Sequence, residues 1–203
     1  MKVVLEILLI VLAYLLGSIP FGYLFTKKFT GMNIRELGSG NIGSTNVRRF
    51  AGAKIALFTQ LCDMLKGLLP VAIVLVLQYM QCCTFDVYII YMVAMTSILG
   101  HNFSIFLRFK GGKGVNTTLG ASVLLSPVPV FLSVFIYFII KKWSKYVSLG
   151  SISLALALSV SELIMHSATP LFYYLLICSV LILARHASNI VRLINKTEPR
   201  SIN

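Results

Sequence analysis

The sequence predicts an all-helical membrane protein, a polytopic bundle of about seven transmembrane helical segments that forms a single domain over residues 1–203. Of its 203 residues, 58% are hydrophobic and only 12% are charged. The mean hydropathy of +0.89 is far above that of a soluble domain. Long apolar runs recur along the chain between short loops, and the lysines and arginines gather in a few of those loops.

The apolar runs lie at residues 3–25, 54–80, 86–107, 116–140, 147–165 and 169–184. A helix needs about 20 apolar residues to cross the hydrocarbon core, so most of these runs are long enough to span it. The first run is too long for a cleavable signal and lacks a small-residue cleavage site, so we expect it to span the membrane. Within it, "GSIPFG", residues 17–22, predicts a kink or a close helix contact.

The basic residues predict the orientation of the chain, because Lys and Arg concentrate on the cytoplasmic side. They cluster in residues 26–53, 108–113 and 141–145 and in the tail, whereas the linkers 81–86 and 166–169 carry none. All the clusters share one side only if the run 116–140 returns to the side from which it starts. "SPVP", residues 126–129, can break that run, because proline lacks an amide and clashes with the preceding turn. We therefore expect two short helices in 116–140, with the amino terminus outside and the carboxyl terminus cytoplasmic; the alternative is a single kinked span.

A polar loop on the predicted cytoplasmic side is the first candidate site. "GSGNIGSTN", residues 38–46, holds three glycines and five small polar residues. Glycines let backbone amides converge on an anion, and the flanking Arg35, Arg48 and Arg49 supply charge for a phosphate or a carboxylate. A flexible, solvated turn is the alternative interpretation of this loop taken alone.

Two further cationic patches strengthen the case. "KGGKG", residues 110–114, directly precedes an expected helix whose free amides favour an anion. It is not a nucleotide P-loop, since Lys113 is followed by Gly114 instead of Ser or Thr. In "RHASNIVRLINK", residues 185–196, four polar residues recur on one helical face: Arg185, Asn189, Arg192 and Lys196. Each patch alone could be a lipid-facing fringe, but together they predict a shared site for a cargo with two phosphates.

Ionisable residues within the apolar runs are candidates for function by default. Asp63 and Lys66 are three residues apart on an expected helix, so a structural ion pair is at least as consistent with them as a catalytic role. Glu162 is expected near the outer end of its run and outside the site. The four cysteines lack paired spacing, so we expect no disulfide framework, no metal site and no cofactor.

Six blocks of the sequence, taken in order, resemble the signature blocks of the bacterial acyl-phosphate:glycerol-3-phosphate acyltransferases, the PlsY family. They are "GSIPFG", "RELGSGNIGSTNVRR", "DMLKG", "GHNFSIFLRFKGGKGVNT", "YVSLGSI" and "RHASNIVRLINKTE". The resemblance covers nearly the whole chain. It implies a multi-pass enzyme of the bacterial plasma membrane with its active site on the cytoplasmic side. Its activity would be transfer of a fatty acyl group from acyl phosphate to glycerol 3-phosphate, giving lysophosphatidic acid and phosphate in phospholipid biosynthesis.

The resemblance also implies a set of substrate-binding residues: Ser39, Asn41, Thr45, Asn46, Arg49, His101, Gly112, Lys113, His186 and Asn189. In this family Arg49 and Lys113 would hold the phosphate of glycerol 3-phosphate. Ser39, His186 and Asn189 would position substrate, and His186 is the candidate catalytic residue. The chain departs from the usual family pattern at Ser104, Asn116 and Lys196. The last departure weakens the case for Glu198 as a site residue.

The residue inventory agrees with this chemistry. An acyl phosphate has a good leaving group, so the enzyme needs chiefly to align a hydroxyl and neutralise two phosphates. Other glycerolipid acyltransferases use a histidine followed four residues later by aspartate, and none of His101, His166 and His186 has that partner. The resemblance implies that a substrate phosphate takes the hydroxyl proton, which would explain why the sequence offers no obvious base.

The expected partners are acyl phosphate, glycerol 3-phosphate and membrane lipid, with a soluble acyl-phosphate synthase as a further candidate and no nucleic acid. Two alternatives come from other classes: a small membrane transporter for an anionic phosphorylated metabolite, and a lipid-binding scaffold. Transporters often show repeated halves, and the sequence has no evident internal repeat.

Overall fold

The computed structural model describes residues 2–201. Within them the chain forms nine α-helices and two short 3-10 helices, with no strand. It divides into two compact units, Met1–Leu124 and Leu125–Asn203. The predicted all-helical membrane fold is confirmed, whereas the single domain, the seven segments and the orientation of the termini stay predictions.

Five stretches of the described residues are long and apolar enough to cross a membrane: Lys2–Thr30, Ser44–Tyr79, Val87–Leu107, Pro127–Ser144 and Val147–His166. A sixth candidate consists of two helices, Pro170–Arg185 and Ala187–Ile194, that meet at a bend of 58°. Apolar side chains that remain exposed on these helices, such as Phe131 and Phe135, are suited to face lipid.

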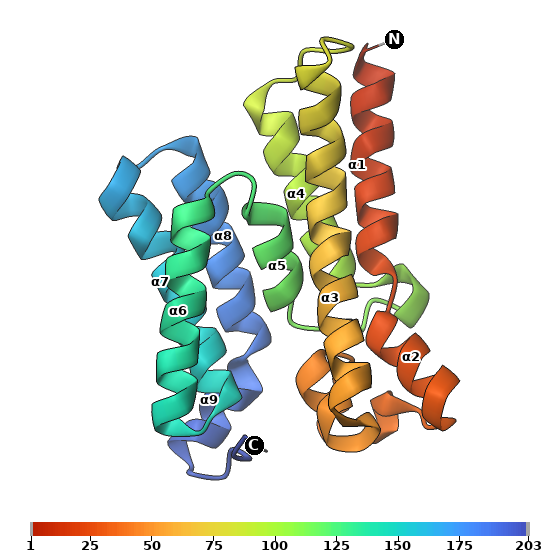
Figure 1. The fold of residues 1–203 in the computed structure, drawn as a ribbon, viewed down its shortest axis with the longest axis vertical. Coiled ribbons are helices and arrows are strands. Elements are labelled where there is room, and N and C mark those ends of the chain that lie inside the picture. Colours follow the sequence, from red (N-terminus) through yellow and green to blue (C-terminus); the bar gives the residue numbers. More distant parts are fainter. Residues whose placement is uncertain (1, 202–203) are drawn as a thin grey trace. The chain divides into compact units, whose positions relative to one another are not determined.

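Five helices build the first unit: α1 (Lys2–Ser18), α2 (Phe21–Thr30), α3 (Ser44–Tyr79), α4 (Val87–Asn102) and α5 (Val115–Ser122). Helices α1, α3 and α4 run side by side along it, and α5 packs against α3 (Figure 1). Glycines on both partners allow α3 and α5 to approach closely. A Cβ on Gly67 would lie 2.2 Å from the carbonyl oxygen of Thr117, and one on Gly120 would lie 1.9 Å from that of Met64. Small residues at such crossings are what membrane helices use in place of a hydrophobic driving force.

The predicted kink in "GSIPFG" is present as a break between α1 and α2 at Ile19 and Pro20, where α2 turns away from the axis of α1 (Figure 1). The predicted close contact is present as well, because a Cβ on Gly17 would lie 2.1 Å from the carbonyl oxygen of Ser97 on α4. The stretch therefore redirects the chain and also packs it tightly.

A small apolar core lies beneath the polar loops of the first unit. Its buried members are Ile34, Ile42, Val47, Ala56 and Leu107. They come from the two 3-10 helices, η1 (Ile34–Glu36) and η2 (Ile105–Leu107), from α3 and from the loop before α3. This core gives the glycine-rich segments a fixed base.

The predicted break in residues 116–140 is also present. Helix α5 ends at Ser122, and α6 (Pro127–Ser144) begins at Pro127. Proline suits the first turn of a helix, where its missing amide needs no partner. With 8 residues, α5 is about 12 Å long and too short to cross the hydrocarbon core alone.

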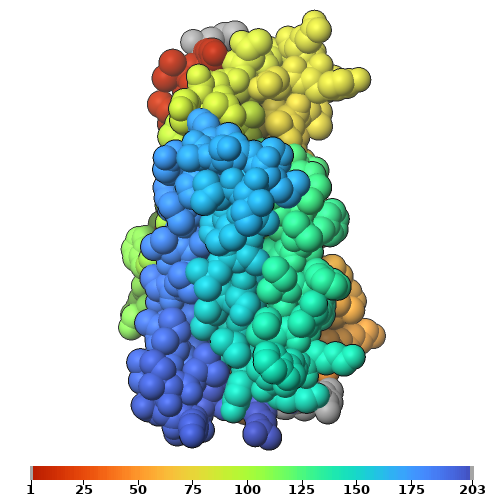
Figure 2. Space-filling model, turned by 90° about the vertical axis from the view of Figure 1, so that its left-hand side faces the viewer, coloured from red at the N-terminus to blue at the C-terminus, as the bar shows by residue number. Residues whose placement is uncertain are grey.

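The second unit consists of α6, α7 (Val147–His166), α8 (Pro170–Arg185) and α9 (Ala187–Ile194). Helix α7 packs between α6 and α8, as Figure 2 shows on the face turned to the viewer. The hydroxyl of Ser179 on α8 donates to the carbonyl of Ala155 on α7 at 2.5 Å. Polar side chains on these helices thus satisfy backbone groups where lipid offers no water.

Topology can be tested with single cysteines introduced at Ser44, Lys142 and Asn195 into a variant that lacks the four native cysteines. If the chain returns at 123–126, all three positions face the cytoplasm, and an impermeant thiol reagent should label none of them in intact cells. Cys82, restored alone in the exposed linker after α3, should be labelled and serves as the control. Labelling at position 142 alone would replace the return by a single kinked span.

Candidate active site

The first polar loop is shaped by one buried side chain, Asn46. Its amide donates to the carbonyls of Leu37 and Asn41, each at 3.0 Å, and its Oδ1 accepts from the backbone N–H of Ser39 at 3.3 Å. A side chain that bonds three points of a short loop holds that loop in one conformation. The described contacts therefore give Asn46 an organising role, and direct contact with substrate stays a prediction.

Further bonds complete the loop. The side chain of Asn41 accepts from the N–H of Gly43 at 2.8 Å. Gly38 and Gly40 have φ of +56° and +66°, a conformation that glycine adopts without strain. Ser39 is exposed at the surface of the turn.

The last third of the "GSGNIGSTN" stretch is helical, because α3 begins at Ser44. Thr45 and Arg49 therefore lie one turn apart on the same face, with Thr45 exposed and Arg49 half-buried. The first amides of a helix have no partner within it and carry the positive end of the dipole. The guanidinium of Arg49 and the start of α3 thus lie near one another beside the loop.

The second polar loop folds back on the end of α4. The N–H of Gly111 donates to the carbonyl of Asn102 at 3.1 Å, and that of Gly112 donates to the carbonyl of His101 at 3.0 Å. Gly112 also lies against the imidazole, because a Cβ there would be 2.1 Å from Nε2 of His101. The loop then enters α5, as predicted, and places half-buried Lys113 just before the free amides of that helix.

Asn102 is a residue of this loop that the sequence analysis missed. It is fully buried, and a Cβ on Gly114 would lie 2.7 Å from its Oδ1. Gly114 has a φ of +79° and forms the turn into α5. The available signal was an amide residue within an apolar run, directly after His101.

In the second unit, His186 lies at the bend between α8 and α9 and is buried. Its Nδ1 is 2.8 Å from the carbonyl oxygen of Ile182. A carbonyl only accepts, so Nδ1 carries the proton of that bond, and in the neutral ring Nε2 is the acceptor. Asn189 lies one turn on, and its N–H donates to the carbonyl of His186 at 2.8 Å.

Glu198 organises the tail more firmly than the sequence suggested. Its carboxylate accepts from the side chains of Asn189 at 2.6 Å and Arg192 at 2.8 Å. Burial alone would raise the pKa of Glu198, but the donor groups of Ser148, Arg192 and Asn189 and the charge of Arg192 hold that pKa below its usual range. Glu198 therefore stays anionic at neutral pH and fixes the orientation of Asn189. The departure at Lys196 concealed this role, because it interrupts the family pattern two residues earlier.

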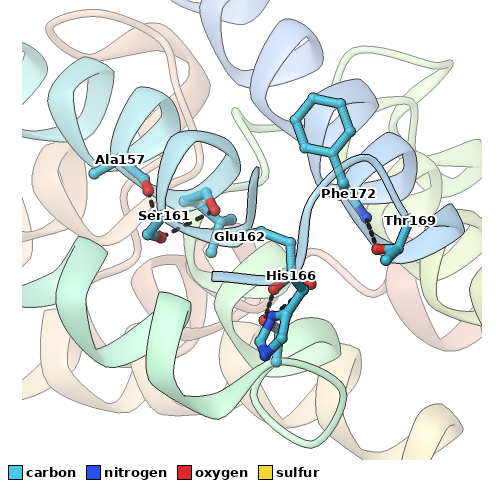
Figure 3. Close-up of polar contacts among 8 residues, drawn as sticks. Ala157, Ser161, Glu162, His166, Thr169 and Phe172 are labelled. Carbon is cyan, nitrogen blue, oxygen red and sulfur yellow. Dashed lines mark hydrogen bonds and ion pairs between the residues drawn. The ribbon is translucent and has the colours of Figure 1, made fainter. Parts of the chain in front are cut away.

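A separate polar cluster lies at the far end of α7 from α9 and includes the exposed His166 (Figure 3). Buried Glu162 accepts from the hydroxyl of Ser126 at 2.5 Å, and its other carboxylate oxygen is 3.1 Å from Nδ1 of His166. Glu162 stands between the serine and the histidine, whereas nucleophilic catalysis needs those two in direct contact. The cluster therefore joins the ends of α6 and α7, and the expectation that Glu162 lies outside the site stays a prediction.

Comparisons with known proteins agree with these features. A model of the family described as glycerol-3-phosphate acyltransferase matches residues 7–196. The chain is 38% identical to the glycerol-3-phosphate acyltransferase of Clostridium acetobutylicum over 96% of this chain and 99% of that protein. It is 43% identical to that of Geotalea daltonii over 95% of this chain and 96% of that protein.

Two crystal structures of PlsY (YgiH), an integral membrane glycerol 3-phosphate acyltransferase, have the same fold. The glycerol 3-phosphate form superposes with a TM-score of 0.86 at 34% identity, over 96% of this chain and 94% of PlsY. The lysophosphatidic acid form gives 0.84 at 33% identity over the same shares of the two chains.

Fold, polar loops and relatives together define a multi-pass membrane acyltransferase. Within that class, the chain belongs to the glycerol-3-phosphate acyltransferase family, the family of PlsY, and so to phospholipid biosynthesis.

Proposed function

We propose that this chain transfers a fatty acyl group from acyl phosphate to the primary hydroxyl of glycerol 3-phosphate. The hydroxyl oxygen attacks the acyl carbon, an ester bond forms, and the bond from that carbon to the bridging phosphate oxygen breaks. The hydroxyl proton leaves with the released phosphate. The products are lysophosphatidic acid and inorganic phosphate.

The observation that carries this proposal is the pair of glycine-rich, cationic loops in the first unit. Each loop leads into a helix start, and each brings a half-buried cation, Arg49 or Lys113. Such sites suit phosphate groups, which bind to free helix amides and to fixed positive charge. The two PlsY crystal structures are a glycerol 3-phosphate form and a lysophosphatidic acid form, which supports the same acceptor and product here.

The proposed residue roles follow from chemistry. Arg49 and Lys113 hold the phosphate of glycerol 3-phosphate, while Ser39, Asn41, Thr45 and Asn189 donate or accept hydrogen bonds around the substrates. His186 positions substrate through Nε2, and the departing phosphate takes the proton. Fixed donors that offset charge on the departing phosphate contribute more here than a strong base, because the leaving group is already good.

The site is proposed to open on the cytoplasmic side of the bacterial plasma membrane. The Lys and Arg clusters of the first unit lie in the loops that carry the site, as expected of cytoplasmic loops. That basic surface also suits a soluble acyl-phosphate synthase as the source of the donor.

Donor choice tests the proposal. Purified protein in lipid bilayers should form lysophosphatidic acid from glycerol 3-phosphate and acyl phosphate, and release one phosphate per product. Acyl-CoA should give no turnover, because no histidine in the sequence has an aspartate four residues later to activate the hydroxyl against a thioester. Equal rates with the two donors would rule out the acyl-phosphate assignment.

A further inference from the structure

A buried polar network inside the first unit links three of the sequence blocks. The ammonium of Lys66 is 2.9 Å from Oδ1 of Asp63 and donates to the carbonyl of Ile19 at 2.9 Å. The same Oδ1 of Asp63 is 3.6 Å from Nδ1 of His101. Asp63, Lys66 and His101 are each 3% exposed or less. The network thus begins at the break between α1 and α2, crosses α3 and reaches the end of α4.

The far side of His101 touches the second polar loop. Gly112 lies so close to Nε2 that a Cβ would be 2.1 Å away, and its N–H bonds to the carbonyl of the same histidine. The imidazole therefore approaches a buried carboxylate through Nδ1 and the loop that carries Lys113 through Nε2.

An ion pair whose only role was to stabilise the fold would not need to contact both the break between α1 and α2 and His101. Burying two charges in a membrane span is expensive, and well-packed apolar residues often stabilise a fold as much. Here both charged groups contact residues at which the backbone changes direction. The ammonium of Lys66 donates to the carbonyl of Ile19, directly before Pro20, and the carboxylate of Asp63 lies beside His101 at the end of α4. The ammonium also lies 5.7 Å from the ring centroid of Phe21, the first residue of α2.

We propose that Asp63 is a positioning residue for acyl transfer. Asp63 holds the imidazole of His101 in place, and the imidazole in turn holds residues 110–114 against the end of α4. The side chain of Lys113 thereby stays oriented toward a phosphate. Lys66 neutralises the carboxylate and ties it to the break between α1 and α2. The inference rests on the proposed function for what Lys113 binds, but the positioning itself rests on the contacts above.

The test is a charge-free double variant, Asp63→Asn with Lys66→Met, in lipid nanodiscs. It leaves no unpaired buried charge and roughly preserves volume, so folding is retained. Amide hydrogen exchange in a peptide covering 108–116 should rise about tenfold or more, because the loop has lost its support. KM for glycerol 3-phosphate should rise about tenfold, as expected when one charged hydrogen bond is weakened, with a smaller change in kcat.

His101→Gln is the second variant, since it keeps the Asp63–Lys66 pair and removes only the ring. It should raise exchange in the same peptide while the peptide over 38–43 stays unchanged. Glu162→Gln, which removes a buried carboxylate in the second unit, is the matched control and should leave exchange in 108–116 unaffected.

Unchanged exchange in 108–116 in both network variants would overturn the positioning role and leave the pair purely structural. An increase in that peptide in both variants supports the role even if the wild-type protein fails to transfer an acyl group. The two failures are thus distinguishable, because exchange reports the loop and turnover reports the proposed reaction.

Discussion

Replacing Lys113 or Arg49 by alanine is expected to lower kcat/KM for glycerol 3-phosphate by roughly ten- to a hundredfold or more. Each side chain is half-buried beside the start of a helix, where an ammonium or guanidinium is partly shielded from water. Loss of one charged hydrogen bond to a phosphate in such a site costs roughly 1.5 to 3 kcal/mol. Steady-state kinetics with acyl phosphate held at saturation would measure the loss.

Two comparison variants make this result specific. Lys54→Ala removes an exposed positive charge close to Arg49 in the chain, just beyond the kink at Gly52, and it should leave kcat/KM within a factor of about two, because exposed charges are well screened. His186→Gln keeps a donor and should cause a smaller loss than Lys113→Ala. If Lys54→Ala were as damaging as Arg49→Ala, overall surface charge would explain the effect better than a phosphate site.

Much of the fold could be predicted from the sequence, because a bilayer constrains helices through length, proline and charge. The break in "GSIPFG", the break before Pro127 and the start of α5 after Gly114 all follow from local backbone chemistry. The start of α3 at Ser44 could not be predicted from the sequence, because a stretch rich in Gly, Ser and Asn is equally typical of a loop. Helix propensity there is weak, and packing over the apolar core decides the outcome.

The candidate site likewise has some features that could be predicted from the sequence and others that could not. The cationic, glycine-rich character of the loops can be predicted from residue types, because it requires no knowledge of distant contacts. The organising roles of Asn46 and Glu198, and the burial of Asn102 against Gly114, could not be predicted, since each depends on a return of the chain that only tertiary packing specifies. Individual candidate ligands such as Ser39 were proposed from resemblance to a family, and spacing alone would not have selected them.

Gly112→Ala is expected to reduce activity severely while the protein remains folded. The new methyl group would lie 2.1 Å from Nε2 of His101 and within 3.0 Å of two ring carbons. The ring is buried and adjoins Asp63 on its other side, so it has little room to move. Overpacking of this kind costs about 1–3 kcal/mol, and the loop yields more readily than the helix end. A shift of about 1 Å in Lys113 can lower the rate by about a hundredfold.

A double-mutant cycle identifies the cause of that loss. In a His101→Ala background the ring is absent, so adding Gly112→Ala should cost much less than it does in the wild type. Gly31→Ala is the control: its φ of +72° carries a backbone cost of about 1 kcal/mol, but a Cβ there meets nothing within 4 Å. It should lower Tm slightly and leave kcat/KM unchanged. Equal losses from Gly112→Ala in the two backgrounds would show that contact with the imidazole does not set the position of the loop.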